Sequence, residues 1–374
     1  MHDRLDGWRL AALVVVSSAC GAPMTSGPTD GGAPGGGSGL ADAGNDDAGA
    51  QLDAGSPFDA GFATDAGASG DAGSMLDAGV GRPTPVGCVT TVAAGHHALR
   101  CDGITWELEI SQACARGGCG LVVDVHGLTM NGNLQDKSTK LRSLGPPRGF
   151  VIAQPTAPSG SLGPTWTPGS DDPKVWAFLQ QLRTALAIDA KRVHMTGFSQ
   201  GGAMTWRMLC AHADVFASVA PIAASDAQSR SSNNPPFMLD CPFTSGRSPS
   251  SEVPVLQMHG ASDGLVPIAK GQQQRDAVIT AWNLGSPVVV STDAQHTRSR
   301  YTSASGLVFE YLQHSYAVTP PRLPVPLAGH CIPGGDDLGA NAPLTQTMFF
   351  SCAPPNAFVW GEVVLQFFVD HPKP

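Results

Sequence analysis

The sequence has few long hydrophobic runs. The apolar run of residues 10–16 is far shorter than the roughly 20 apolar residues that a membrane-spanning helix needs. Two arginines precede this run, and small residues follow it up to Cys20. A basic start, a short apolar stretch and small residues together are typical of an export signal. We therefore predict that residues 1–20 form a signal peptide rather than a membrane span.

Two kinds of cleavage fit the end of this signal. The small residues Ser17 and Ala19 suit an ordinary signal peptidase that cuts just before Cys20. The same stretch resembles a bacterial lipobox, in which Cys20 would carry a lipid and become the mature N-terminus, although Ser17 stands where such motifs usually have Leu. We favour the lipoprotein interpretation because a long tether follows directly. The alternative is a soluble secreted protein.

An excess of basic residues is also missing. The chain has 22 Lys and Arg against 31 Asp and Glu, a net charge of -9. Residues 1–86 contain 11 of those acids and 3 of those bases, which leaves 20 acids and 19 bases, a net charge of -1, for the rest. A nearly neutral domain has no long-range attraction for a polyanion. We therefore expect no nucleic-acid partner.

The first 86 residues lack the hydrophobic periodicity of helices and strands. The triplet Asp-Ala-Gly occurs seven times between residues 41 and 79. A repeat this short and this poor in apolar residues cannot offset the entropy of ordering the chain. We predict a disordered linker over residues 21–86, which either holds the rest of the chain away from a membrane or has no selected length. Residues 87–374 are then long enough for one large domain.

The cysteines do not show the spacing of a zinc site. The only short spacing joins Cys114 and Cys119, and no Cys/His pair of matching spacing completes a site. With Cys20 set aside, eight of the nine cysteines remain, and an even number in an exported protein favours disulfides. Pairing between sequence neighbours is the simplest arrangement, namely Cys88 with Cys101, Cys114 with Cys119, Cys210 with Cys241, and Cys331 with Cys352. We expect no metal site.

Strand-like segments alternate with helical patterns along the rest of the chain. The strand-like segments are rich in Val and Ile and are expected at 121–126, 150–154, 193–196, 218–222, 253–259 and 307–312. Helical periodicity is expected at 174–187, 201–212, 269–284 and 356–370. This alternation predicts an α/β fold whose mainly parallel sheet is covered by helices on both faces. The segment 105–110 is predicted to be an antiparallel strand at the sheet edge.

A serine motif lies between a predicted strand and a predicted helix. Residues 197–201 read Gly-Phe-Ser-Gln-Gly and follow the strand expected at 193–196. The Gly-x-Ser-x-Gly pattern is common, but this setting is the one that a nucleophile elbow requires. A Cβ at Gly197 or Gly201 would clash in so sharp a turn. Ser199 is therefore the candidate nucleophile, and the alternative is a glycine-rich turn with a bystander serine.

A serine hydroxyl needs a base to take its proton, and in the fold that carries this turn the base is a histidine later in the chain. His330 lies in a loop rich in Gly and Pro ahead of the last predicted helix, where such histidines are found. The alternative for His330 is an ordinary surface-loop residue. The other histidines after Ser199 are His212, His259, His296, His314 and His371.

Asp263 is the candidate acid that orients the histidine. It follows the strand expected at 253–259, at the sheet edge where ligands bind in α/β folds. The alternative is an Asp that caps a helix or turn. Asp293, in a polar loop, and Glu310, inside a strand, are weaker candidates.

Two backbone amides are expected to hold the oxyanion of an acyl-transfer reaction. One is the N–H of Gln200, directly after the nucleophile, and the other comes from the loop after an early strand. His126 ends such a strand, and we select the N–H of Leu128 shortly after it. His126 itself is predicted to be structural. Trp166, in a Pro-rich loop, is expected to be a packed aromatic residue more than a pocket wall.

The stretch from residue 189 to 223 resembles the bacterial esterases grouped with polyhydroxybutyrate depolymerases and feruloyl esterases. It contains the turn Gly-x-Ser-x-Gly-Gly-Ala-Met and then Phe-Ala-Ser-Val-Ala-Pro at 216–221. An early His-Gly, an Asp segment that ends in Val-Pro, and a late Gly-His follow in the family's order. The resemblance covers about residues 88–370.

This resemblance implies an α/β-hydrolase fold in which Ser199, Asp263 and His330 have the catalytic roles. The sequence departs from the family at Ile332, where the family often has Trp, so we expect a pocket wall to lose an aromatic side chain. In tannase-like esterases the Ser and the His are each flanked by a Cys. Here Cys331 follows the His, but a Phe precedes the Ser, so that pairing is absent.

Together with the predicted export signal, the resemblance implies a secreted serine esterase that acts on polymers or on acyl groups linked to polysaccharides. The expected partner is the ester substrate, and a lipid on Cys20 would add a membrane tether. No metal or organic cofactor is implied. Two other interpretations stay open. One is a non-catalytic protein on the same fold that binds a polymer or polysaccharide, and the other is a peptidase or acyltransferase.

Overall fold

The computed structural model describes residues 81–161, 163–225, 243–318, 327–336 and 350–374. The export signal, Cys20 and the linker up to residue 80 therefore lie outside the described residues and stay predictions. None of the helices within the described ranges is long and apolar enough to cross a membrane.

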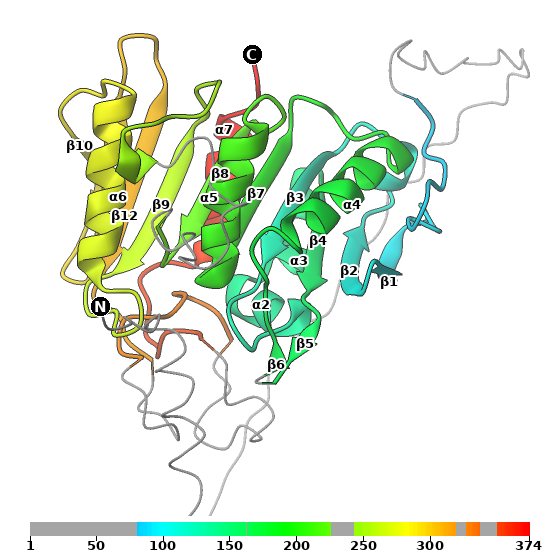
Figure 1. The fold of residues 1–374 in the computed structure, drawn as a ribbon, viewed down its shortest axis with the longest axis horizontal. Coiled ribbons are helices and arrows are strands. Elements are labelled where there is room, and N and C mark those ends of the chain that lie inside the picture. The colour runs from blue at the N-terminus through cyan, green and yellow to red at the C-terminus, as the bar shows by residue number, and fades with distance from the viewer. Residues whose placement is uncertain (1–80, 162, 226–242, 319–326, 337–349) are drawn as a thin grey trace, which may run out of the picture. The chain divides into compact units, whose positions relative to one another are not determined.

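A large twisted sheet organises the described residues (Figure 1). Its ten strands lie in the order β1-β2-β4-β3-β7-β8-β9-β12-β11-β10. The six central strands are parallel to one another, and the pairs at both edges are antiparallel. The strands are β1 (Gly95–Cys101), β2 (Ile104–Ile110), β3 (Gly120–Val125), β4 (Phe150–Thr156), β7 (Val193–Phe198), β8 (Ser218–Ile222), β9 (Val255–Gly260), β10 (Val288–Thr292), β11 (His296–Thr302) and β12 (Val308–His314). A separate short hairpin joins β5 (Ser159–Gly160) to β6 (Gly163–Pro164).

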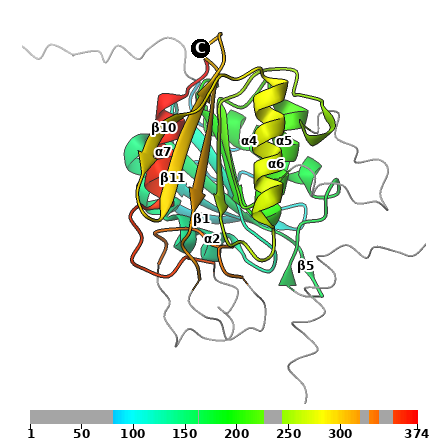
Figure 2. The same ribbon diagram turned by 90° about the vertical axis from the view of Figure 1, so that its left-hand side faces the viewer.

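Helices cover both faces of the sheet, as the view in Figure 2 shows. On one face lie α4 (Asp172–Ala185), α5 (Gln200–His212) and α6 (Ile268–Ala281), and on the other lie α2 (Gly132–Thr139), α3 (Leu141–Leu144) and α7 (Trp360–Asp370). Strand β3 shows why the core has two halves, because successive side chains of a strand point to opposite faces. Leu121, Val123 and Val125 belong to the α4–α5–α6 core, whereas Val122 belongs to the α2–α3–α7 core. Central strands buried on both faces need apolar residues throughout, as predicted.

The helices form where apolar residues recur at helical spacing. In α4, Val175, Phe178, Leu179 and Leu182 form one buried face, and a proline near its start fits the first turn of a helix. The predicted helix at 356–370 begins only at Trp360. Before it, the side chain of Asn356 accepts a hydrogen bond from the amide of Gly334, so this segment anchors a neighbouring loop instead of extending the helix.

The predicted α/β fold with a mainly parallel sheet is confirmed, and each predicted strand is present with small shifts of its ends. One prediction is wrong in part. The segment 105–110 forms β2 and is antiparallel, but β1 pairs outside it, so β2 is not the edge. The hairpin of β10 and β11 at the other edge was not predicted, because its residues are mostly exposed and carry no buried apolar pattern.

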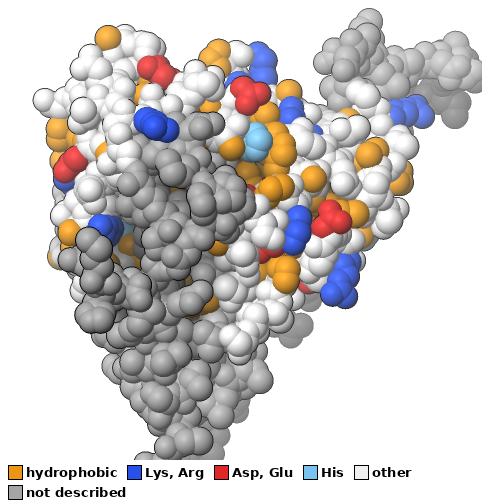
Figure 3. Space-filling model, in the orientation of Figure 1, with side chains coloured by type: hydrophobic (Ala, Val, Ile, Leu, Met, Phe, Trp, Pro, Cys, Tyr) orange, Lys and Arg blue, Asp and Glu red, His pale blue; other side chains and the backbone are white. Residues whose placement is uncertain are grey.

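Three of the predicted disulfides are present: Cys88–Cys101, Cys114–Cys119 and Cys331–Cys352. The fourth predicted pair includes Cys241, which lies outside the described residues. Charges of both signs are interspersed on the face shown in Figure 3, in keeping with the nearly neutral composition of residues 87–374.

Candidate active site

Ser199 lies at the sharp turn between β7 and α5. Its backbone has φ 55° and ψ -112°, a sparsely populated conformation with positive φ that costs a residue with a side chain about 1–3 kcal/mol. The amide of Ser199 donates to the carbonyl of Ile222 on β8 at 2.9 Å, which holds the turn against the neighbouring strand. The side chain is 3% exposed.

Two glycines allow this turn to form. A Cβ at Gly197 would lie 2.5 Å from the carbonyl oxygen of Gly201, and a Cβ at Gly201 would collide with the carbonyl oxygen of Val125 on β3. Both obstacles are backbone atoms, which cannot move aside without shifting a central strand or the helix. The predicted clash at both glycines is confirmed.

The position of the turn in the sheet favours ligand binding. Strands β3 and β7 are neighbours, but the chain leaves β3 toward β4 on one side and leaves β7 toward β8 on the other. Such a reversal opens a crevice at the carboxyl ends of the two strands, where ligands bind in α/β folds. Ser199 follows β7 at this edge. Gly127, which follows β3, lies beside it, because a Cβ on Gly127 would be 3.3 Å from the Cβ of Ser199.

Asp263 lies in the loop after β9 and is buried. Its Oδ1 accepts hydrogen bonds from the amides of Leu265 at 2.9 Å and Val266 at 2.7 Å, so the loop itself fixes the carboxylate. Its Oδ2 lies 2.7 Å from Nδ1 of His330. Burial alone would raise the pKa of Asp263, but the charge and hydrogen bond of His330 and the nearby His259 outweigh it and hold the pKa below its ordinary value. Asp263 therefore stays ionised at neutral pH.

The loop of His330 is attached to the loop of Asp263 by backbone contacts. The amide of Gly329 donates to the carbonyl of Ser262 at 3.1 Å, and a Cβ on Gly260 would collide with the carbonyl oxygen of Gly329. The chain brings the two loops together although His330 and Asp263 are 67 residues apart in sequence.

Aromatic side chains hold the His330 ring on its other sides. The ring centroid of Phe198, the residue before Ser199, lies 4.7 Å from that of His330, and Phe350 meets it edge-on at 5.7 Å. The disulfide Cys331–Cys352 links the residue after His330 to the segment before α7. The histidine is thus packed directly against the turn that carries the serine.

His259 is a further buried histidine at this acid, and its part in the site was not predicted. Its Nε2 donates to the carbonyl of Val266 at 2.8 Å and lies 3.6 Å from Oδ2 of Asp263. Burial lowers its pKa, so the ring is neutral. His314 lies behind it at the end of β12, and burial lowers the pKa of His314 to about 4. The only sequence signal was that both histidines end strands.

The amides predicted for the oxyanion remain available in the structure. Neither the N–H of Gln200 nor that of Leu128 donates to another residue among those described. The next amide, that of Thr129, is occupied because it donates to the carbonyl of Pro164 at 2.8 Å. Thr129 also has φ 64°, so the chain turns sharply directly after Leu128.

His126 and Trp166 build the frame under these amides. His126 accepts the amide of Ala157 on Nε2 at 3.0 Å, so its proton lies on Nδ1, which donates to the carbonyl of Gly127 at 2.6 Å. Burial lowers the pKa of His126 to about 4, and the ring stays neutral. The indole N–H of Trp166, only 2% exposed, donates to the carbonyl of His126 at 2.9 Å. Both side chains therefore have structural contacts, as predicted.

The weaker candidates have other contacts. His212 stacks on Trp176, His371 contacts the carbonyl of Phe367, His296 pairs with Asp293, and Glu310 is buried between Arg298 and Arg300. Ile332 is fully buried in the core of the α7 face, in a cluster that includes Leu327 and Phe350. The prediction that this position forms a pocket wall was therefore wrong, because a fully buried side chain packs beneath the site.

Comparison with known proteins gives a consistent family. The Phospholipase/Carboxylesterase family matches residues 172–302, which include Ser199 and Asp263. A bifunctional acetylxylan esterase/xylanase of Neocallimastix patriciarum is 26% identical over 148 residues, 39% of this chain and 19% of that protein. Feruloyl esterase D of Neurospora crassa is 31% identical over 101 residues, 27% of this chain and 29% of that protein. The chain thus spans less than a third of the length of these two relatives.

Among solved structures, an acetyl xylan esterase from Aspergillus awamori superimposes with a TM-score of 0.48 at 14% identity, covering 59% of this chain and 93% of that one. The esterase names of the matching family and relatives are consistent with the mainly parallel sheet and with the glycine-flanked serine turn of this structure. Together they support an α/β-hydrolase fold and a similarity to the feruloyl esterase-like esterases.

Proposed function

We propose that this protein is a serine esterase that hydrolyses carboxylic esters, with Ser199 as nucleophile, His330 as base and Asp263 as the orienting acid. The observation that carries the proposal is the pairing of Asp263 with His330 at 2.7 Å, with the His330 ring packed against the residue that precedes Ser199. A strained serine, a buried histidine and an ionised carboxylate at one sheet edge match the parts of a catalytic triad.

The proposed reaction passes through an acyl-enzyme. Oγ of Ser199 attacks the acyl carbon while Nε2 of His330 takes its proton, and the amides of Gln200 and Leu128 stabilise the oxyanion. The tetrahedral intermediate then collapses, the ester C–O bond breaks, and His330 gives the proton to the leaving alcohol. Water, deprotonated by His330, attacks the acyl-enzyme in the same way and releases the acid and free Ser199.

Labelling with a fluorophosphonate tests the nucleophile directly. We expect wild type to be labelled once and Ser199→Ala to be unlabelled, whereas Ser143→Ala, an exposed serine on α3, should label like wild type. A folded wild type that hydrolyses no p-nitrophenyl ester and takes no label would favour a non-catalytic binding protein on this fold. Amide hydrolysis, or acyl transfer that outcompetes water, would favour a peptidase or acyltransferase.

The natural substrate is proposed to be an acyl group on a polysaccharide or a polyester. Support comes from two relatives, whose names describe an acetylxylan esterase and a feruloyl esterase. A panel of acetyl, longer-chain acyl and hydroxycinnamoyl esters, each tested on wild type and Ser199→Ala, distinguishes these classes. Hydrolysis confined to simple short-chain esters, with no activity on any polymer-linked acyl group, would count against this part.

We also propose that the protein is exported and tethered through a lipid on Cys20. The three described disulfides support export, because disulfides persist in oxidising compartments. Mass spectrometry of the mature N-terminus tests the tether. A diacylglyceryl cysteine supports it, and an unmodified terminus means release as a secreted protein.

A further inference from the structure

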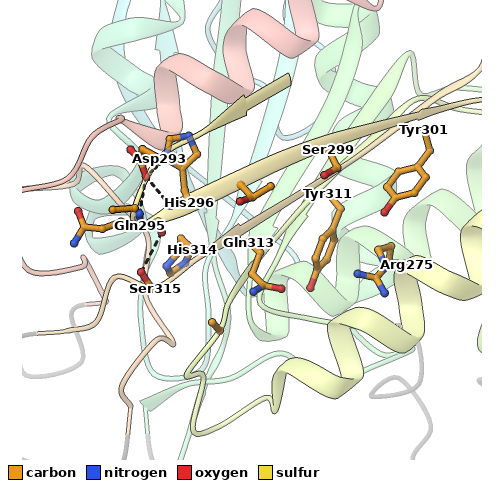
Figure 4. Close-up of a pocket in the computed structure, with 13 residues that line it drawn as sticks. Arg275, Asp293, Gln295, His296, Ser299, Tyr301, Tyr311, Gln313, His314 and Ser315 are labelled. Atoms are coloured by element: carbon orange, nitrogen blue, oxygen red, sulfur yellow. Dashed lines mark hydrogen bonds and ion pairs between the residues drawn. The ribbon is translucent and has the colours of Figure 1, made fainter. Parts of the chain in front are cut away.

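A polar pocket lies between α6 and the face of β11 and β12, away from Ser199 in the sequence and in the sheet order. Its volume is about 360 Å³, within the usual range for small-molecule sites. Figure 4 shows its lining side chains, which come from α6, from both strands and from the turn between β10 and β11. No step of the proposed reaction uses these residues.

One end of the pocket combines a cation with two phenols. Figure 4 shows Arg275, Tyr301 and Tyr311 at the same end. The guanidinium carbon of Arg275 lies 5.2 Å from the ring centroid of Tyr311, and its Nε donates to Asp276 at 2.8 Å. Its two Nη groups donate to no other described residue, so they remain available to a ligand.

The hydroxyl of Tyr311 is a second polar group at this end with no partner among the described residues. Tyr311 is 4% exposed, and its buried hydroxyl has no hydrogen-bond partner among the described residues. Buried polar groups nearly always have a partner, so such an exception calls for a ligand or solvent in the pocket. The chain has only three tyrosines, and two of them line this pocket. A phenol O–H and two guanidinium N–H groups together suit a carboxylate.

The other end of the pocket suits neutral hydroxyl groups. Gln295, Gln313 and Ser315 line it together with Asp293, which is held by the amides of Gln295 and His296. These side chains offer both donors and acceptors at several points. Nδ1 of His296 lies 2.9 Å from Oδ1 of Asp293 at this end of the pocket.

We propose that this pocket is a binding site for an acidic sugar, a uronate whose carboxylate lies on Arg275 and Tyr311 and whose hydroxyl groups face the amide-rich end. A neutral sugar would offer the guanidinium Nη groups and the phenol only uncharged oxygen acceptors, which bind them more weakly than a carboxylate does. A simple carboxylate would leave the amide-rich end empty. Only a ligand with both groups uses the whole lining.

The pocket adjoins the loop of the candidate acid. Ala261 lines the pocket, and its amide donates to the carbonyl of His314 at 2.7 Å, two residues before Asp263. A sugar unit bound here would lie near the carboxyl ends of β9 and β12, the sheet edge at which Ser199 follows β7. This second statement, that the pocket is a substrate subsite, rests on the proposed esterase function. The binding itself does not.

Binding is tested on the full chain with Ser199→Ala, so that hydrolysis plays no part. Protein-observed NMR titrations use D-glucuronate and D-galacturonate as ligands. D-Glucose, which has the sugar hydroxyl groups without the carboxylate, and acetate, which has the carboxylate without the hydroxyl groups, are the half-probes. We expect at least one uronate to bind saturably and both half-probes to bind at least about tenfold more weakly, since each lacks one set of charge-assisted or neutral hydrogen bonds.

Two variants locate the site. Arg275→Gln and Tyr311→Phe are each expected to weaken uronate binding about tenfold or more. Lys270→Gln removes the same charge from an exposed position of the same helix and should leave binding unchanged. Tyr311→Phe removes only the unpaired hydroxyl, so it keeps the fold if Arg275→Gln does not.

The proposal is overturned if neither uronate binds saturably, if acetate or glucose binds as well as the uronate, or if Arg275→Gln and Tyr311→Phe bind like wild type. If the uronate binds as expected but Ser199 proves unreactive toward fluorophosphonate, the pocket stands and the esterase proposal fails. If Ser199 reacts with the fluorophosphonate and the protein hydrolyses esters but no uronate binds, the esterase proposal stands and the uronate site fails.

Discussion

Replacing Asp263 by Asn should abolish most activity while leaving the fold intact, because the loop fixes the direction of the new amide. In wild type, Oδ1 accepts two backbone amides at 2.9 and 2.7 Å and Oδ2 faces Nδ1 of His330 at 2.7 Å. The amide of Asp263→Asn must keep its oxygen on those two donors, so its NH₂ group turns toward His330. The imidazole must then accept on Nδ1 and carry its proton on Nε2.

A proton on Nε2 prevents His330 from taking the proton of Ser199. Loss of the correct tautomer in a triad of this type lowers kcat by about 10⁴-fold, which corresponds to about 5 kcal/mol of transition-state stabilisation. We expect a loss of this order in kcat with little change in KM, because Asp263 is buried and contacts the imidazole rather than the substrate.

The assay is steady-state hydrolysis of a p-nitrophenyl ester, with circular dichroism to show that the variant is folded. Asp189→Asn is the matched control, since Asp189 is partly exposed just before the amino end of β7, opposite the edge of Ser199, and should keep wild-type rates. If folded Asp263→Asn keeps more than about a tenth of wild-type kcat, Asp263 does not set the tautomer and the proposed triad is refuted.

Three other outcomes follow from the contacts of single residues. Gly201→Ala should prevent stable folding, seen as loss of a cooperative thermal transition, because its Cβ collides with the carbonyl of Val125; a wild-type Tm would contradict this. Burial raises the pKa of Asp124 from 3.8 to about 6, so the folded protein binds a proton at Asp124 more tightly than the unfolded chain does. The free energy of unfolding should therefore fall by about 3 kcal/mol as the pH rises from about 4 through 6 and Asp124 loses this proton. Urea titrations of wild type and Asp124→Asn at pH 4.5 and 8 check it, and an equal pH dependence in both would contradict it. Replacing Cys331 and Cys352 together by Ala should lower kcat and change KM less, because the disulfide anchors the loop that carries the proposed base His330. Unchanged kcat and KM would show that packing alone holds this loop.

Much of the site frame was predictable because its signals are local. The strand, the glycines and the helix around Ser199 are adjacent in sequence, and each determines backbone geometry within a few residues. The three described disulfides join near neighbours, so counting cysteines along the chain was sufficient to propose them. Other features were not predictable in this way. Ile332 looked like a pocket residue because its segment resembles a family motif, but its burial depends on Phe350 and α7, which lie further along the chain.

The sequence by itself determined the alternation of strands and helices, the two-sided burial of the central strands and the sharp turn at Ser199, since these follow from periodicity and glycine placement. Only the tertiary structure decided which of six histidines meets which acid, because loops 67 residues apart are joined by packing that no local pattern records. It also placed His259 beside Asp263, added β1 outside β2, and gathered Arg275 and two tyrosines from three separate elements into one pocket. Contacts of this kind form between helices, strands and loops that are distant in the sequence. Their stabilising free energy comes from surfaces that meet only in the folded protein, so no local sequence pattern predicts them.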